Sequence, residues 1–173
     1  MDQIYKHPKR KTKVVFVQLG SPAEPTTKAL RKYLRKFLGD PRVIDINPWL
    51  WKIILNFFVL PFRPKKSAKL YARIWDGKSF PLITNTRDFT NNVREELKKI
   101  DPNGHVEVNH AFLLSPPYVN EVYDSWEDDL KKGIGATKLL VIPMFPQYSE
   151  STIASGIDAL AKELSKRVKI PTF

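Results

Sequence analysis

The sequence predicts a three-layer α/β domain over residues 14–173, in which helices cover both faces of a mainly parallel β-sheet. Short runs rich in β-branched residues, such as Val14-Val15-Phe16-Val17, alternate with longer segments whose apolar residues recur at helical spacing. The short runs are apolar at consecutive positions, which is typical of strands buried on both faces of a parallel sheet. The length of 173 residues and the hydrophobic fraction of 42% suit one domain and exclude a disordered or fibrous chain.

The charged residues are distributed unevenly. The formal net charge is +11, and residues 1–73 carry 17 Lys and Arg against 4 Asp and Glu, whereas residues 74–173 carry 12 against 14. A one-sided basic surface points to an anionic partner: a nucleic acid, an acidic membrane surface or a carboxylated small molecule. The chain has no cysteine, which excludes disulfides, thiolate nucleophiles and cysteine zinc sites and is compatible with a reducing compartment.

The first part of the chain predicts an arm, a strand and a helix. Residues 1–13 hold five Lys and Arg and lack the apolar core of a signal peptide, so we expect a flexible basic arm and no export. The first strand covers 13–19 and ends at Gly20-Ser21-Pro22, and a helix follows that Thr26 or Thr27 caps. The polar face of this helix carries Lys28, Arg31, Lys32, Arg35 and Lys36.

An unusually apolar segment covers residues 47–62. It opens with Asn47-Pro48, a good helix start, and is almost free of polar residues as far as Leu60. The run is shorter than the roughly 20 apolar residues that a membrane-spanning helix needs. Two interpretations stay open: a helix buried in the core, or a lip that lies at a lipid surface. The aromatic residues of this lip are Trp49, Trp51, Phe57, Phe58 and Phe62, and the cations beside it are Arg63, Lys65 and Lys66.

The remaining elements continue the alternation of helices and strands. We expect a basic helix over 65–75, an irregular stretch over 76–81, strands over 105–114 and 138–142, and the start of a further strand over 169–173. Each of the three later helices is expected to bury one apolar face. The first of them buries Phe89, Val93, Leu97 and Ile100, and the second buries Val119, Val122, Tyr123, Trp126 and Leu130. The last, over 149–168, buries Ile153, Ile157, Leu160, Ala161 and Leu164.

The loops that follow the expected strands are the first place to look for a site. Ligands of parallel α/β folds bind beyond the carboxyl ends of the strands, which brings the loops at Gly20, Ser115 and Tyr148 to one rim. His105 and His110 fall on opposite faces of one strand, so they cannot jointly bind a metal ion. We therefore expect no metal site, and we expect His110 to be a hydrogen-bonded core histidine.

Four segments, in this order along the chain, carry a resemblance to one family. They are Gln18-Leu19-Gly20-Ser21-Pro22, the helix and turn over 29–45, the segment Leu60-Pro61-Phe62-Arg63-Pro64-Lys65-Lys66-Ser67-Ala68-Lys69-Leu70-Tyr71, and Pro146-Gln147-Tyr148-Ser149-Glu150-Ser151-Thr152. Together they resemble ferrochelatase, the enzyme that inserts ferrous iron into a porphyrin to make haem. The resemblance extends over essentially the whole chain from Val14.

The resemblance implies a chelatase-like domain of flavodoxin-like topology, the amino-terminal half of a metal-inserting lyase of haem biosynthesis. The implied partners are a porphyrin and a carboxy-terminal chelatase domain that is absent from this chain. Ferrous iron is the implied substrate and no cofactor is implied. The family's catalytic histidine and glutamate belong to the absent half, so we assign no catalytic residue and no metal ligand, and we expect this fragment to be inactive alone. The lip is implied to rest on a membrane, which predicts a cytoplasmic protein at the membrane periphery.

The resemblance also assigns the residues that contact the porphyrin. The hydroxyls of Ser149, Ser151 and Thr152 lie near a helix start, where they suit a propionate carboxylate and equally suit helix capping. The assigned porphyrin contacts are Leu19, Gly20, Ser21, Pro22, Lys69, Tyr71, Arg73, Gln147, Tyr148, Ser149, Ser151 and Thr152.

Three positions in or near the expected cleft depart from the family pattern. Phe80 replaces a small hydroxyl residue, Leu113-Leu114 replace a pair that commonly contains tyrosine, and Glu150 adds an acid to the last loop. These departures keep open a non-catalytic porphyrin-binding or membrane-surface module derived from such an enzyme. Nucleic-acid binding is disfavoured, because the basic residues are interleaved with a lipid-like helix and no nucleic-acid module occurs.

Overall fold

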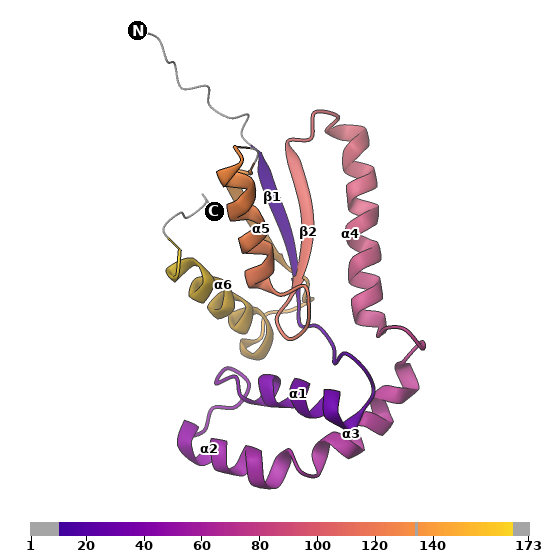
Figure 1. Cartoon of the computed structure of the whole chain (residues 1–173), viewed down its shortest axis with the longest axis vertical. Coiled ribbons are helices and arrows are strands. Elements are labelled where there is room, and N and C mark those ends of the chain that lie inside the picture. The colour runs from indigo at the N-terminus through magenta and orange to yellow at the C-terminus, as the bar shows by residue number, and fades with distance from the viewer. Residues whose placement is uncertain (1–10, 134, 168–173) are drawn as a thin grey trace.

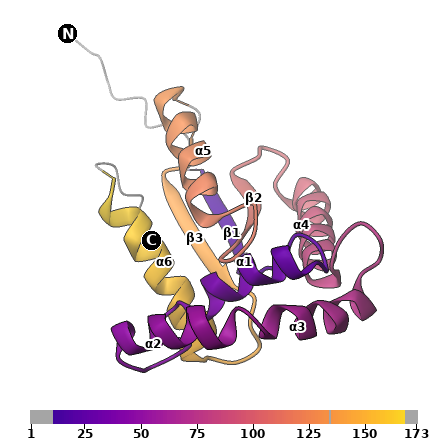
Figure 2. The same cartoon turned by 60° about the horizontal axis from the view of Figure 1, so that its bottom comes forward.

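Three parallel strands form the sheet at the centre of the molecule, which is partly hidden behind a helix in Figure 1 and open to view in Figure 2. The structure is a computed structural model that describes residues 11–133 and 135–167. The strands are β1 (Thr12–Gln18), β2 (Val106–Phe112) and β3 (Lys138–Pro143), and β1 pairs with both of the others. The helices are α1 (Thr27–Leu38), α2 (Pro48–Ile54), α3 (Arg63–Tyr71), α4 (Pro81–Ile100), α5 (Val119–Lys131) and α6 (Ser155–Ser165), with π-helical turns at Leu55–Val59 and Glu150–Ala154 and a 3₁₀ turn at Ala72–Ile74.

Helices cover both faces of this sheet, as the sequence predicts. Successive side chains of a strand point to opposite faces. Val15 and Val17 pack with residues of α5 and α6, whereas Val14 and Phe16 pack with residues of α4. The strand is therefore buried at consecutive positions, and the three-layer α/β architecture is confirmed. The inward face predicted for α5 is also confirmed, because all five of its residues belong to the core on that side.

The chain between β1 and α4 forms a layer of helices across the carboxyl end of the sheet (Figure 2). Helix α1 starts after Thr26, whose side chain accepts a hydrogen bond from the backbone N–H of Ala29 at 3.2 Å. On its apolar face, Leu34 packs with Leu55 and Leu60 from the segment that follows α2, and these side chains form a separate small core. This core holds α1 directly beneath the loops that leave the strands, where the sequence places the candidate site.

Several side chains predicted to face the core are exposed. Ile100, the last residue of α4, is 78% exposed, and Ile157 and Ala161 are exposed on α6. Phe89 is 43% exposed, although its ring meets Phe16 edge to face with ring centres 5.1 Å apart. Ile100 lies at the end of its helix, and within residues 11–133 and 135–167 no element covers that side of α6, so helical spacing alone overestimated these buried faces. The strand predicted over 169–173 lies outside the described residues.

The predicted arm over 1–13 is too long at its carboxyl end, because Thr12 and Lys13 belong to β1. Lys13 is only 1% exposed. Its ammonium Nζ lies 3.2 Å from a carboxylate oxygen of Glu107 on β2 and 3.7 Å from one of Asp129 on α5. The buried ammonium of Lys13, at the amino end of β1, is therefore paired with carboxylates from both β2 and α5. Residues 1–10 of the arm lie outside the described part of the chain.

Candidate functional site

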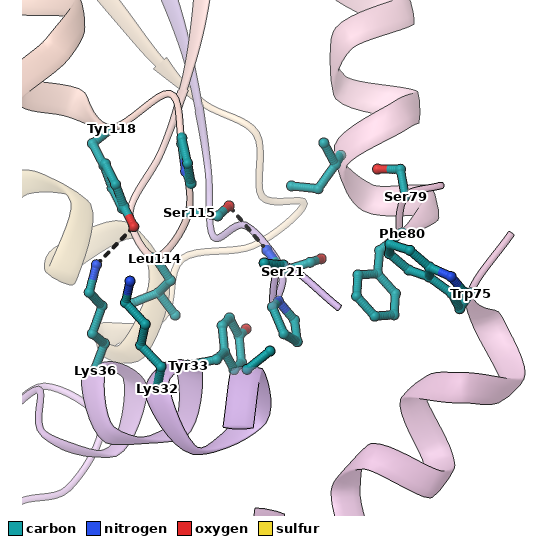
Figure 3. Close-up of a pocket in the computed structure, with 15 residues that line it drawn as sticks. Ser21, Lys32, Tyr33, Lys36, Trp75, Ser79, Phe80, Leu114, Ser115 and Tyr118 are labelled. Atoms are coloured by element: carbon teal, nitrogen blue, oxygen red, sulfur yellow. Dashed lines mark hydrogen bonds between the residues drawn. The ribbon is translucent and has the colours of Figure 1, made fainter. Parts of the chain in front are cut away.

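A pocket of about 310 Å³ lies between the carboxyl ends of β1 and β2, helix α1 and the start of α4 (Figure 3). Of the sequence-predicted porphyrin contacts, Ser21 and Pro22 line it directly. Phe80 and Leu114, two of the positions that the sequence analysis expects to differ from the family pattern, line it as well. The pocket therefore forms at the rim that the strand order predicts.

Gly20 lies where the loop after β1 packs closely against the loop after β2. Its φ angle is +91°, a backbone conformation that glycine adopts readily and other residues rarely do. Next to it, the backbone N–H of Ser21 donates to the side-chain oxygen of Ser115 at 3.3 Å. The phenol of Tyr33 donates to the carbonyl oxygen of Gly20 at 3.4 Å, and burial, together with the neighbouring Tyr71, raises the pKa of Tyr33 well above its usual range. Tyr33 is therefore a neutral donor that holds this loop.

A cluster of aromatic rings forms one wall of the pocket. Phe80 is 2% exposed and meets Trp75 and Tyr71 edge to face, with ring centres 4.7 Å and 5.5 Å apart. Tyr71 in turn lies 6.3 Å from the ring of Tyr33. The family resemblance assigns Tyr71 to porphyrin contact, but Tyr71 is not among the residues that line the pocket; its ring packs against Phe80, which does line it. The ring of Phe80 makes this wall more apolar than a small hydroxyl residue at that position would.

Two lysines supply positive charge to the pocket. Lys32 and Lys36 point from α1 into the cavity (Figure 3). The ammonium of Lys36 donates to the phenol oxygen of Tyr118 at 3.0 Å and lies 4.2 Å from the centre of that ring. The sequence predicts both lysines on the polar face of the helix but does not assign them to the site. Their spacing of four residues was the available signal, since it puts them on one side of the helix.

The predicted loop 147–152 lies apart from this pocket. Ser151 and Leu19 line a neighbouring cavity of about 90 Å³, and Leu114 borders both cavities. The hydroxyl of Ser149 is hydrogen-bonded to the hydroxyls of Ser151, at 3.1 Å, and Thr152, at 2.8 Å. These hydroxyls therefore bond to one another, and the Ser149 side chain does not cap the helix that follows.

The other predicted contacts are solvent-exposed side chains. Lys69 on α3 and Arg73 in the turn after it are exposed, as are Gln147 and Tyr148 in the last loop. None of the four lines the 310 Å³ pocket. Glu150, the third position expected to differ from the family pattern, is also exposed and outside that pocket.

His110 does not form the hydrogen bond expected of it. Its Nδ1 is buried and has no partner among the described residues, and the ring packs against Phe112 with centres 5.5 Å apart. Burial, and then the charges of Arg94 and Arg87, lower the pKa of His110. Within residues 11–133 and 135–167, no three His, Asp or Glu side chains are grouped closely enough to hold a metal ion.

The apolar lip exposes most of its aromatic side chains. Four of them, which we call the aromatic rim, are between 67% and 76% exposed: Trp49, Phe57, Phe58 and Phe62. The interpretation as a wholly buried core helix is therefore wrong for these residues, while Leu55 and Leu60 are buried. Trp51 differs, because its indole N–H donates to the carbonyl oxygen of Leu38 at 2.6 Å. Among the described helices, none is both long and apolar enough to cross a bilayer.

Comparisons with known proteins identify the family. A ferrochelatase family model matches residues 11–173. The chain is 41% identical over 158 residues to the ferrochelatase of Idiomarina loihiensis, a match that covers 91% of this chain and 42% of that protein. It is 39% identical over 165 residues to the coproporphyrin III ferrochelatase of Streptococcus mutans, covering 95% of this chain and 49% of that protein. The chain thus spans less than half the length of these relatives, and since the family model matches nearly all of it, the chain belongs to the ferrochelatase family.

Proposed function

We propose that this chain is the amino-terminal half of a ferrochelatase and that its pocket binds a porphyrin, the substrate of iron insertion in haem biosynthesis. The observation that carries the proposal is the pocket itself. It lies at the carboxyl ends of β1 and β2 and has an aromatic wall at Phe80 and an apolar contact at Leu114. A flat apolar ring with acidic substituents suits such walls, because apolar area removed from water drives its binding and a few polar groups orient it.

Iron insertion needs groups that distort the macrocycle, accept two pyrrole protons and deliver ferrous iron. The pocket supplies walls for the ring, but Tyr33 holds its proton too tightly to accept pyrrole protons at neutral pH. We assign proton acceptance and iron delivery to a histidine and a glutamate in the carboxy-terminal chelatase domain, the partner that the family resemblance implies. Ferrous iron is then a substrate that this half does not hold by itself.

The proposal predicts porphyrin binding without iron insertion. We expect the 173-residue chain to quench porphyrin fluorescence in a saturable titration and to insert no ferrous iron under anaerobic conditions. Ala23→Trp, which places a bulky ring at the pocket lining, is expected to weaken binding about tenfold or more, since it removes room for the ligand. The matched control Ala72→Trp lies on an exposed turn outside the pocket and should leave binding unchanged.

Two results would contradict this proposal. Equal binding by the Ala23→Trp and Ala72→Trp variants would show that the porphyrin does not use the pocket. Iron insertion by residues 1–173 alone would refute the assignment of the catalytic groups to the other domain.

A second candidate is a non-catalytic porphyrin-binding module, and the pocket residues Phe80 and Leu114 favour it. Both depart from the family pattern and both line the cavity, so they change its shape where the substrate would lie. Joining the chain to a carboxy-terminal chelatase domain separates the two candidates. A two-domain form that binds porphyrin and inserts iron supports the enzyme, whereas binding without insertion supports the module.

We also propose that the aromatic rim attaches the protein to the surface of an acidic membrane. Exposed aromatic side chains next to the exposed cations Arg63, Lys65 and Lys66 are the combination that binds an anionic lipid surface. The cytoplasmic face of a membrane is the acidic surface that this arrangement suits.

The membrane proposal predicts co-sedimentation with phosphatidylserine vesicles that weakens as salt is added. Replacing all four rim residues by serine is expected to reduce binding by at least about tenfold, because each buried aromatic ring contributes about 1.5 to 3 kcal/mol. Ile100→Ser is the control, since it removes an equally exposed apolar side chain at the end of α4. Unchanged binding of the fourfold variant, or equal loss with Ile100→Ser, would refute a role for the rim.

A further inference from the structure

Strand β2 lies at an edge of the sheet. The strand order is β2-β1-β3, so among the described strands β2 has a neighbour on one side only (Figure 2). The backbone groups of successive residues in a paired strand point alternately toward that neighbour and away from it. The carbonyl oxygen of His105 accepts from the N–H of Thr12 in β1 at 2.7 Å, so the odd-numbered residues of β2 face β1. The even-numbered residues, from Val106 to Phe112, therefore turn their backbone N–H and carbonyl groups outward.

Two of these outward groups are covered by side chains from helix α4 and from the residue after it. Helix α4 runs alongside β2 (Figure 1). The guanidinium Nε of Arg94, on α4, donates to the carbonyl oxygen of Val108 at 2.7 Å. The N–H of Val106 donates to the carboxylate of Asp101, the residue that follows α4, at 2.7 Å. Backbone groups that could bond to another strand therefore bond within the chain instead.

The guanidinium of Arg94 lies along this edge and is held by both α4 and β2. Its Nη1 donates to the side-chain oxygen of Asn91, on the same helix, at 3.0 Å. Its Nη2 donates to the side-chain oxygen of Asn109, on β2, at 2.8 Å. All three nitrogens of the planar group are thus bonded, which fixes its orientation. A strand that approached β2 at this point would have to displace it.

The carboxylate of Asp101 is also held by more than one group. One of its oxygens accepts from Val106, and the other lies 3.0 Å from Nδ1 of His105. The bond from the Val106 N–H, and then the bond to the His105 ring, lower the pKa of Asp101. Asp101 is therefore a charged acceptor at neutral pH, and hydrogen bonds to charged acceptors are the stronger class.

A groove of about 380 Å³ runs beside the covered part of the edge. Its lining includes Val106 and Val108 of β2 and Leu97 of α4, together with the cation Lys98 and the anion Glu107. Open space beside outward-facing backbone groups lets an extended chain reach the edge of a sheet. Because the groove carries charges of both signs, a second copy of the same edge suits it: a twofold arrangement can bring cations of one copy to anions of the other.

We propose that Arg94 and Asp101 hold the edge of β2 closed, and that the edge uncovered by their removal binds the same edge of a second copy of this chain. Two identical edges are complementary when they run antiparallel about a twofold axis, because each strand supplies both donors and acceptors. The inference goes beyond the proposed function and does not depend on it, since neither residue lines the porphyrin pocket.

The test measures self-association of the 173-residue chain by sedimentation velocity over a series of concentrations. Arg94→Met/Asp101→Ala removes both covering side chains and leaves the net charge unchanged. This variant is expected to associate about tenfold more strongly than wild type, because the uncovered backbone groups gain partners in the second copy. Arg87→Met/Asp88→Ala is the matched control. It removes the same residue types from an exposed ion pair on α4, whose side chains bond to each other, and should sediment like wild type.

Amide hydrogen exchange locates the contact between the copies. In the Arg94→Met/Asp101→Ala variant, the outward N–H groups of Val106 and His110 should exchange more slowly as the concentration rises, because they pair across the new interface. In wild type, the N–H of Val106 should exchange slowly at every concentration, because Asp101 already holds it. Each single variant, Arg94→Met or Asp101→Ala, should show the same change to a smaller degree, so the test does not require the double variant to fold.

Several results would overturn the inference. Variants at Arg94 and Asp101 that associate no more strongly than wild type, or no more strongly than the control, would show that these side chains do not close the edge. Association without slower exchange at Val106 and His110 would place the contact elsewhere on the molecule. Fast exchange of the Val106 N–H in wild type would show that Asp101 does not cover it, a result that needs no variant. Each of these outcomes leaves porphyrin binding as it stands.

Discussion

Replacing Glu107 and Asp129 together by their amides is expected to destabilise the chain by about 3 kcal/mol, the lower end of the cost of leaving a buried charge unpaired. Lys13 is almost fully buried, and these two carboxylates are its ion-pair partners, at 3.2 Å and 3.7 Å. The amides keep the shape of both side chains but remove the compensating charge. The carboxylates are partly exposed and the lysine is not, so the loss of stability comes from leaving the buried ammonium group of Lys13 without an opposite charge.

A double-mutant cycle in urea checks this prediction. Lys13→Met keeps most of the side-chain volume and is expected to be close to neutral, within about 1 kcal/mol, since an apolar residue can replace a buried ion pair. Adding Lys13→Met to the two amides should restore most of the lost stability. Glu95→Gln, which breaks an exposed pair with Lys98, is the control and should cost less than about 1 kcal/mol. A cost for the two amides as small as that of the control would show that Lys13 does not depend on its partners.

The sequence is sufficient to predict the layers of this fold because the relevant signals are local. Consecutive apolar residues in β1 and the helical stripe of α5 each bury the faces that their periodicity predicts. Lys13 could not be predicted in the same way. Its partners on β2 and α5 are far away in the sequence and meet it only after the sheet has formed. From the sequence alone, a charged residue before an apolar run is therefore assigned to the arm.

The sequence predicts only part of the candidate site, because the rest depends on how distant segments pack together. The position of Ser21 and Pro22 follows from strand order, since the loop after a central parallel strand lies at the ligand-binding edge. The sequence does not predict that Lys32 and Lys36 line the pocket, because periodicity separates polar from apolar faces but does not show which polar residues border a cavity. That information depends on how α1 lies across the end of the sheet, which the small core around Leu34 and Leu60 determines. The family motif predicts Tyr71 at the site, but its ring packs against Phe80 and does not line the pocket.

Gly20→Ala is expected to destabilise the chain by about 3 kcal/mol and to abolish saturable porphyrin binding. About 1 to 2 kcal/mol arises from the positive φ angle, which disfavours any side chain, and a similar amount arises from overpacking. An added Cβ would collide with the side-chain oxygen of Ser115 and approach Cβ of Phe112 to 3.0 Å. The collision would separate the β1 and β2 loops that form the pocket floor, and it would break the bond from Ser21 to Ser115.

Gly77→Ala separates the two contributions to that cost. Gly77 has nearly the same φ angle, +92°, but an added Cβ meets no atom within 4 Å, so its substitution should cost only the backbone share of about 1 to 2 kcal/mol. Urea unfolding of the two variants measures the difference, and a porphyrin titration measures the effect on the pocket. Removing the colliding oxygen in Gly20→Ala/Ser115→Ala should recover part of the lost stability. Equal stability losses for Gly20→Ala and Gly77→Ala would contradict the prediction, because they would show that the two strand loops can separate without cost and that close contact at Gly20 does not shape the pocket.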